Sequence, residues 1–266
     1  MTRDANTPHP ERRAALMAGI PNGLLAALPR KSYLRLLPGL SPVNLIFGEV
    51  LYEPGKPIRE VYFPGECLVS LLTPVDSHLS IEVGLVGREG MVGIPLALGI
   101  HVSSVRALVQ GAGPALKMDA ARFRSELRGS APLQRELHRY IHAMMAQISQ
   151  TAACNRFHVV EARLARWLLM TRDRMRSGEF RMTHEFLSHM LGVRRAGVTE
   201  AASALQRHKL IEYSRGIIRI LDDRGLEAAC CNCYEIVKHA QDGGAASRRG
   251  FAGTGGSAAG AVVTPP

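Results

Sequence analysis

The segment at residues 182–205 reads MTHEFLSHMLGVRRAGVTEAASAL. Thr183 is suited to cap a helix, and three apolar residues follow it at the spacing of one helical face: Phe186, Leu187 and Met190. Gly192 then supplies a tight turn, and a second helix begins at a pair of arginines. The segment therefore predicts two short helices joined at a glycine.

The second helix is expected to have one buried face and one exposed face. Its buried stripe consists of Val198, Ala201, Ala202 and Leu205. The residues that then face outward are Arg194, Arg195, Thr199 and Glu200. In a helix-turn-helix the first helix supports the second, whose N-terminal residues reach base edges in the major groove. We expect these four outward residues to contact DNA.

A basic hairpin follows the two helices. Residues 210–220, LIEYSRGIIRI, predict two short strands around a Ser-Arg-Gly turn, which is the wing of a winged helix. Arg215 in this turn is an expected phosphate contact, as are Thr183, His184 and Ser188 of the first helix. Phosphate contacts position a protein on DNA without specifying its sequence. For His184, a solvated histidine on the helix surface is an equally good interpretation.

The charge of the chain favours a polyanionic partner. Its 266 residues carry a formal net charge of +10, and the sequence pI is about 9.8. DNA, RNA and an anionic membrane surface are all polyanions that a protein with such a positive charge can bind. Between residues 156 and 224 there are 14 Lys or Arg against 8 Asp or Glu, so much of the excess lies around the helix-turn-helix.

Other sequence features limit the location and the class of the protein. No apolar run reaches the roughly 18 residues of a membrane span, and the N-terminal residues lack the apolar core of a signal peptide. Five cysteines, an odd number, fit a reducing compartment. We expect a cytoplasmic protein without membrane association. The chain has no nucleophile elbow, phosphate-binding loop or HExxH motif, so we predict no catalytic residue and no enzyme activity.

The N-terminal half has the character of a small β domain. Residues 1–24 are predicted to be a flexible lead-in, and residues 25–128 a separate domain. Its predicted strands, separated by glycine and proline, are residues 50–52, 61–64, 67–72, 79–83 and 107–110. Short strands of this kind indicate a small antiparallel sandwich or barrel.

A long helix is predicted over residues 129–156. Its apolar residues recur every three or four positions: Leu133, Leu137, Tyr140, Met144, Ile148 and Thr151. This pattern suits either a dimer seam or an ordinary core helix, and the position of the helix between two domains favours the seam. Residues 157–237 then form the DNA-binding domain, and residues 238–266, rich in Gly, Ala and Ser, a disordered tail.

With its predicted parts in this order, a β domain, a long helix and a winged helix, the chain resembles the Crp–Fnr family of bacterial transcription regulators. The resemblance covers roughly residues 28–236. The most specific part is LGVRR at residues 191–195, where the family has Leu-Gly, two residues and then Arg. VYFPGECLVS at residues 61–70 and GREGMVG at residues 87–93 look like the family's sensor barrel. The resemblance implies an α+β fold with a jelly-roll-like, double-stranded β-helix sensor barrel, a dimerisation helix and a C-terminal winged helix-turn-helix.

The resemblance also implies a function. A homodimer would bind a palindromic operator in double-stranded DNA, with RNA polymerase as a further candidate partner and a small-molecule effector of unknown identity. Arg195 falls on the family's base-reading arginine, which can grip guanine O6 and N7 together. Ala196 stands where the family often has glutamate, and Glu200 replaces a later arginine, so the operator should differ from the usual one. Glu200 either accepts from cytosine N4 or pairs with Arg194 or Arg195.

Family members that bind cyclic nucleotide hold its phosphate with a Gly-Glu pair and, some ten residues later, an arginine followed by a small residue. Here Gly93 begins Gly-Ile-Pro-Leu, so the glutamate is missing and the proline removes one amide donor. We interpret the cyclic-nucleotide site as degenerate. The effector-binding candidates that the resemblance leaves are Arg88, Glu89, Gly93, Ser103, Ser104 and Arg106. The alternative function is a cyclic-nucleotide-binding signalling module whose basic C-terminal domain docks onto a protein.

The cysteines admit two interpretations. No cysteine precedes Cys67, which argues against the family branch that carries an iron–sulfur cluster on N-terminal cysteines. Cys230 and Cys233 have CxxC spacing, but a zinc site needs further ligands. Those available are Cys67, Cys154 and His239. We favour, over a zinc site, the interpretation in which the CCNC segment supplies small buried residues on a final helix, and we predict no metal ion and no cofactor. The roles of Cys230, Cys231 and Cys233 stay open.

Overall fold

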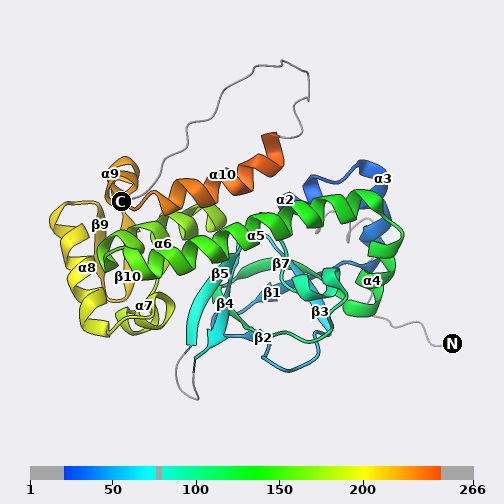
Figure 1. The fold of residues 1–266 in the computed structure, drawn as a ribbon, viewed down its shortest axis with the longest axis horizontal. Helices are drawn as coiled ribbons and strands as arrows, with labels where there is room; N and C mark the ends of the chain where they lie inside the picture. The colour runs from blue at the N-terminus through cyan, green and yellow to red at the C-terminus, as the bar shows by residue number, and fades with distance from the viewer. Residues whose placement is uncertain (1–20, 76–79, 247–266) are drawn as a thin grey trace, which may run out of the picture.

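A computed structural model describes residues 21–75 and 80–246 of the chain. A β domain, a long helix α5 (Ala131–Phe157) and a winged helix follow one another in sequence, and the winged helix lies at one end of α5 (Figure 1). The predicted α+β fold is confirmed. Most of the expected lead-in and tail lies outside the described residues. The described parts of both segments are helical, since α2 begins at Gly23 and α10 continues to Ala246.

Two antiparallel sheets face each other in the β domain. One has the order β1 (Ser41–Leu45), β7 (Gly113–Asp119), β3 (Glu60–Pro64). The other has the order β2 (Val50–Tyr52), β6 (Arg106–Gly111), β4 (Leu68–Pro74), β5 (Ser80–Val86). The predicted sandwich is therefore present. The sequence patterns missed β1 and β7, because β1 contains Pro42 and β7 begins with Gly-Pro, which are weak strand signals.

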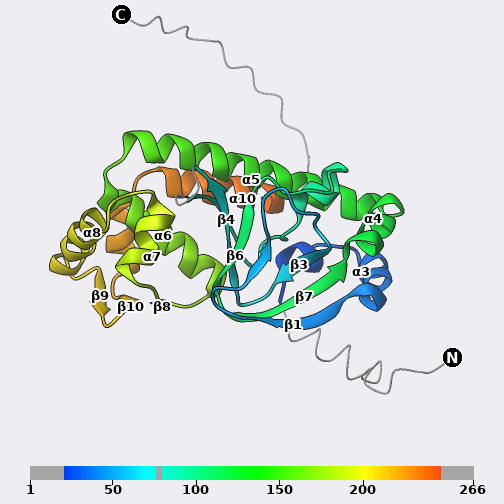
Figure 2. The ribbon, with the colours of Figure 1, turned by 90° about the horizontal axis from the view of Figure 1, so that it is seen from below.

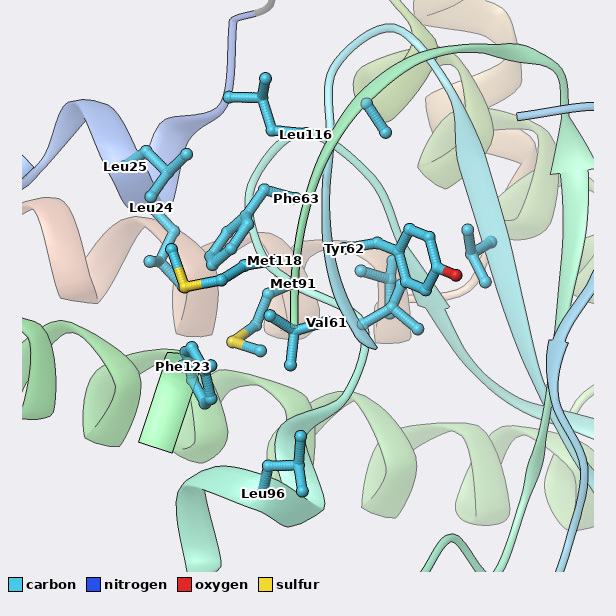
Figure 3. Close-up of a cluster of buried hydrophobic side chains, with 14 of the residues drawn as sticks. Leu24, Leu25, Val61, Tyr62, Phe63, Met91, Leu96, Leu116, Met118 and Phe123 are labelled. Carbon is cyan, nitrogen blue, oxygen red and sulfur yellow. The ribbon is translucent and has the colours of Figure 1, made fainter. Parts of the chain in front are cut away.

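The core of the β domain lies between the sheets and under the helices that close it. Figure 3 shows Val61 and Phe63 of β3 with Met118 of β7, and Phe123 packs beside them. Leu24 of α2 (Gly23–Ala26), a short helix in the expected lead-in, reaches the same cluster. The remaining elements that close this domain are α3 (Arg30–Leu36), η1 (Leu37–Gly39), η2 (Ile94–Leu98) and α4 (Ala120–Arg128).

Strand β4 is buried on both faces. Val69 and Leu71 point into the core of the β domain, whereas the alternate residues Leu68 and Leu72 belong to the core of the winged helix, together with Trp167. This explains the nearly continuous apolar run of β4. The outer face of this sheet is thus part of the core of the winged helix.

Helix α5 begins where the sequence predicts, but its apolar stripe has a different partner. Ser130 caps the helix by accepting from the Leu133 amide, and Pro132 lies in the first turn. The predicted seam residues Leu133, Leu137, Tyr140 and Met144 are buried in the core of the β domain. That part of the seam prediction is wrong, because these four residues pack within one protomer.

The winged helix is built from five helices and a small sheet among the described residues. The helices are α6 (Val160–Met175), α7 (His184–Leu191), α8 (Arg195–Arg207), α9 (Asp223–Ala229) and α10 (Cys233–Ala246). The antiparallel sheet has the order β8 (Glu179–Arg181), β10 (Ile217–Ile220), β9 (Ile211–Ser214). Helix α10 turns back and lies along α5 (Figures 1 and 2). Within the described ranges, no helix is long and apolar enough to cross a membrane.

Candidate nucleic-acid interface

Helices α7 and α8 form the predicted helix-turn-helix. The Thr183 hydroxyl oxygen accepts from the Phe186 amide at 3.1 Å and caps α7. Gly192 ends α7 in the left-handed conformation, with φ of 61°, and the Val193 amide donates to the Ser188 carbonyl at 3.0 Å. Three residues later α8 begins at Arg195.

Gly192 is required for a second reason. A Cβ atom at this position would lie 2.7 Å from the Cδ1 atom of Ile81, on strand β5 of the sensor sheet. The turn of the helix-turn-helix therefore presses against the β domain. Phe47, beside β1, adds to this contact, since its ring lies 5.7 Å from that of Phe186 on α7.

The start of α8 presents its polar residues to solvent. Arg194, Arg195, Thr199 and Glu200 are all exposed, and the predicted buried stripe is buried. Within the described part of the chain, no carboxylate forms an ion pair with either arginine, so the pairing interpretation of Glu200 has no support. Both guanidinium groups, and the Glu200 carboxylate, are available to an external partner.

His184 acts within the protein rather than at its surface. Its ring stacks on Tyr213 of β9 with centroids 4.2 Å apart, and Nδ1 lies 3.0 Å from the Thr199 hydroxyl on α8. Burial, and then the nearby charge of Arg195, lowers the pKa of His184, so the ring is held in its neutral form. This histidine joins α7, α8 and the wing. Tyr213 could not be identified from the sequence, because its stacking on His184 depends on how the wing folds back.

Ser188, one of the predicted phosphate contacts, does not face the solvent. The residue is buried, and its hydroxyl donates to the Glu185 carbonyl within α7 at 2.6 Å. A phosphate contact therefore has no support in the structure. Thr183 is exposed and remains a predicted phosphate contact.

The wing carries a basic tip. Arg215 and Gly216, with φ of 50° and 80°, form a two-residue hairpin turn between β9 and β10. Arg215 is exposed at this tip. Arg219 of β10 is already paired with Glu179 and Glu212, so Arg215 is the wing residue that we retain as a DNA contact.

Comparisons with known proteins agree with this geometry. Residues 162–229 match the model of the Crp-like helix-turn-helix domain. Several solved structures share the fold of the larger part of the chain. One is a transcriptional regulator of the CRP/FNR family from Thermus thermophilus, with 20% identity and a TM-score of 0.59 over 73% of this chain and 98% of its own. This chain contains a Crp-like helix-turn-helix domain, and the larger part of it has the fold of that CRP/FNR-family regulator.

Two further solved structures that share this fold come from other bacteria. FixK2 of Bradyrhizobium japonicum is 13% identical, with a TM-score of 0.61 over 72% of this chain and 98% of its own. The c-di-GMP-responsive global regulator CLP of Xanthomonas campestris is 16% identical, with a TM-score of 0.60 over 73% of this chain and 100% of its own. At these identities the likeness concerns the fold. No curated protein matches the sequence.

In this Crp/Fnr fold, the predicted effector residues are largely engaged in internal contacts. Glu89 pairs with the buried Arg174 of α6 at 2.9 Å, and Arg174 also donates to Gln147 of α5 at 2.6 Å. Glu89 therefore ties the sensor domain to the DNA-binding domain. Arg106 pairs with Glu53 at 2.8 Å on the surface.

The remaining predicted effector residues do not gather into a binding site. The buried Tyr52 side chain interacts with both the Gly93 backbone and the Ser103 side chain. Ser103 also donates to the Val105 carbonyl at 2.8 Å. Ser104 is exposed and Arg88 is half-buried. This geometry supports the interpretation of a degenerate cyclic-nucleotide site.

Two pockets lie elsewhere. One of about 190 Å³ lies between α2 and α5 and includes Glu89 of the predicted effector set. An open pocket of about 670 Å³ lies between η2, α4 and α5. Its nitrogen-bearing side chains are His101, Arg124, Arg128, Gln134 and His138. This second pocket contains none of the predicted effector residues, and its basic lining suits an anionic ligand.

Proposed function

We propose that this protein is a Crp/Fnr-type transcription regulator that binds a palindromic operator in double-stranded DNA. The observation that carries the proposal is the exposed pair Arg194 and Arg195 at the start of α8, in a domain that matches the Crp-like helix-turn-helix. Arg195 can donate to guanine O6 and N7 together, and Glu200 can accept from cytosine N4. Thr183 and Arg215 supply phosphate contacts from α7 and the wing.

We further propose that the protein acts as a homodimer through α5. Four residues form an apolar strip next to the barrel-facing side of the helix: Ile141, Met145, Ile148 and Ala152. Their spacing of four, three and four is that of a coiled-coil seam. Met145 is 63% exposed, and Ile148, the one predicted seam residue in this strip, is 37% exposed. Parallel pairing of two α5 helices puts both winged helices at the same end, as a palindromic operator requires (Figure 1).

The sensor domain is proposed to bias DNA binding through its contact with α6 and α7. An effector that favours one arrangement of this contact by a few kcal/mol suffices for a switch. The proposal includes a small-molecule effector, without specifying which one, and a contact with RNA polymerase. A regulator of this kind acts in the cytoplasm, where the bacterial chromosome is, and we assign it no catalytic step.

The test begins with duplexes recovered from a random DNA pool by the full-length protein. Wild-type protein is expected to shift such a duplex at physiological salt, and the double variant Arg194→Ala, Arg195→Ala to lose this binding. Arg207→Ala, which removes an exposed arginine from the other end of α8, is the matched control and should bind like the wild type. Equal binding by all three proteins would refute the proposal.

The alternative function is a cyclic-nucleotide-binding module whose basic domain docks onto a protein. It predicts calorimetric binding of cyclic AMP or cyclic GMP without specific DNA binding. The interaction of Tyr52 with Gly93 and Ser103 disfavours this alternative, because it engages two of the residues that the resemblance offers for effector binding. Specific DNA binding without heat from either nucleotide would support the regulator.

A further inference from the structure

Four potential metal ligands meet where α5 ends and α10 begins. Cys154 and His158 belong to the last turn of α5 and its cap. Cys231 lies two residues before α10, and Cys233 is the first residue of that helix. Their ligand atoms all lie within 4.8 Å of one another. All three cysteines are buried, whereas His158 is exposed and closes the group from the solvent side.

The spacing of these atoms matches one small tetrahedral ion. The Cys154 and Cys231 sulfur atoms are 3.5 Å apart, and the Cys233 sulfur is 3.4 Å from His158 Nδ1. Two thiolates bound to Zn²⁺ at about 2.3 Å in a tetrahedron lie about 3.8 Å apart. An iron–sulfur cluster, which inserts several iron and sulfide atoms between its ligands, needs a wider group.

The surroundings of the group favour bound thiolates. Arg163 and Arg166 of α6 are buried and lie close enough to Cys154 to interact with it electrostatically. Within the described ranges, neither arginine forms an ion pair with a carboxylate, and the Nε atom of each has no hydrogen-bond partner. Buried cations need a nearby negative charge. Three thiolates, one neutral histidine and Zn²⁺ together carry a charge of −1, which supplies part of the negative charge that the two buried arginines need.

Hydrogen bonding around the ligands is also suited to a metal site. Gln150 Nε2, one turn before Cys154, donates to the Cys233 sulfur at 3.1 Å. Donors of this kind orient a thiolate ligand. The neighbouring Cys230 is not part of the group, and its thiol donates to the Cys231 carbonyl at 3.3 Å.

We propose that Cys154, His158, Cys231 and Cys233 bind one Zn²⁺ ion in a structural Cys3His site. Binding releases the thiol protons, so the site fills more completely as pH rises. The ion joins the C-terminal end of α5 to the start of α10, directly before α6 enters the DNA-binding domain. It thereby fixes the joint between the long helix and the winged helix.

The test uses full-length protein without a histidine tag, purified without chelator. Elemental analysis is expected to find one zinc per chain. Zinc-free protein titrated with Co²⁺ should develop the visible bands and the thiolate-to-cobalt absorption of a tetrahedral site. Cys231→Ser and His158→Ala should weaken Co²⁺ binding by about a hundredfold or more, since even outer contacts to a metal contribute up to that factor. His158 is exposed, so its replacement leaves the core intact, which circular dichroism can verify.

Cys230→Ser is the matched control, because it removes a thiol from the same loop without removing a ligand. It should keep both the zinc and the cobalt spectrum. Four results would overturn the proposal: no zinc and no cobalt spectrum, an iron-and-sulfide chromophore instead, a Cys154–Cys231 disulfide in freshly purified zinc-free protein, or loss of metal from Cys230→Ser equal to that from Cys231→Ser.

Discussion

Arg195 is the first residue of α8, exposed and without a carboxylate partner among the described residues. We expect Arg195→Ala to reduce operator affinity by about 1–3 kcal/mol and to relax the preference at one position of each half-site, because a bidentate contact to guanine is lost. Fluorescence anisotropy on the selected duplex and its single-base variants measures both effects. If Arg207→Ala, at the other end of the same helix, lowers affinity equally, the loss reflects general charge rather than base recognition.

Glu82 gives the protein a specific pH dependence. Burial raises the pKa of Glu82 to about 7 from an ordinary 4.5, although Ser70 and Trp167 both donate to its carboxylate. Between these values the folded state keeps a proton that the unfolded state has lost. The free energy of unfolding should therefore fall as pH rises from 4.5 to about 7, by up to about 3 kcal/mol, and then stay level with respect to this group.

Glu82→Gln removes this ionisation while it keeps an oxygen acceptor for Trp167. Denaturant unfolding at several pH values should show that the variant lacks the decline, whereas Glu66→Gln, at an exposed site, keeps the wild-type profile. Parallel pH profiles for wild type and Glu82→Gln would count against the buried carboxylate as the cause.

Single residues were predictable where their role is local. Thr183 as a cap and Gly192 as a left-handed turn follow from residue type and spacing alone, and the structure confirms both. The contacts of Ser188 and His184 were not predictable. Ser188 donates to the backbone of α7, and His184 stacks on Tyr213 of the wing, so both depend on the folded structure. His158, a ligand of the proposed metal site, was missed for a related reason: it lies 75 residues before Cys233 and belongs to no recognisable motif with it.

Helix α5 exposes the apolar strip defined by Ile141, Met145, Ile148 and Ala152. Met145→Glu is expected to turn the dimer into a monomer, because it buries a charge in the seam without a partner. Sedimentation equilibrium measures the change. His142→Glu introduces the same side chain on an exposed neighbouring face and should leave the dimer intact. A monomeric wild type, or a dimeric Met145→Glu variant, contradicts the assignment of this face.

The wing is expected to contribute affinity rather than sequence preference. Arg215→Ala should weaken binding by a similar factor for operator and unrelated duplexes. It should reduce the slope of log affinity against log salt by about two, because each protomer of the dimer loses one phosphate contact. Titrations at several salt concentrations test this. An unchanged slope would indicate that the tip of the wing does not reach a phosphate.

At the level of elements, periodicity identified α5 but not its neighbours. The stripe from Leu133 to Met144 has the spacing of a seam, and equally that of a helix packed on a sheet. Only the folded structure shows that this face of α5 packs on the β domain and that a different face packs on α10. The apolar run of β4 likewise predicted a strand, but it did not reveal that the strand is buried on both faces and that α6 covers the second one.

In the molecule as a whole, the sensor and DNA-binding domains share a boundary rather than a linker. The Trp167 indole of α6 donates to Glu82 of β5 at 2.9 Å, and Arg174 bridges Glu89 and Gln147. The turn before α8 rests on Ile81 of the same sheet. A change in this sheet can therefore reach the recognition helix through a few packed residues, which is the arrangement that an allosteric regulator needs.

The central claim is that two copies of α8 contact the bases of one two-fold symmetric DNA site. Selection from a random duplex pool, followed by hydroxyl-radical footprinting of the recovered sequences, tests it directly. The account predicts two protected half-sites with centres about 10 base pairs apart, and it predicts that Arg195→Ala loses the preference at one position in each. Recovery of no enriched sequence, a single unsymmetric footprint, or an unchanged preference in Arg195→Ala would contradict the account.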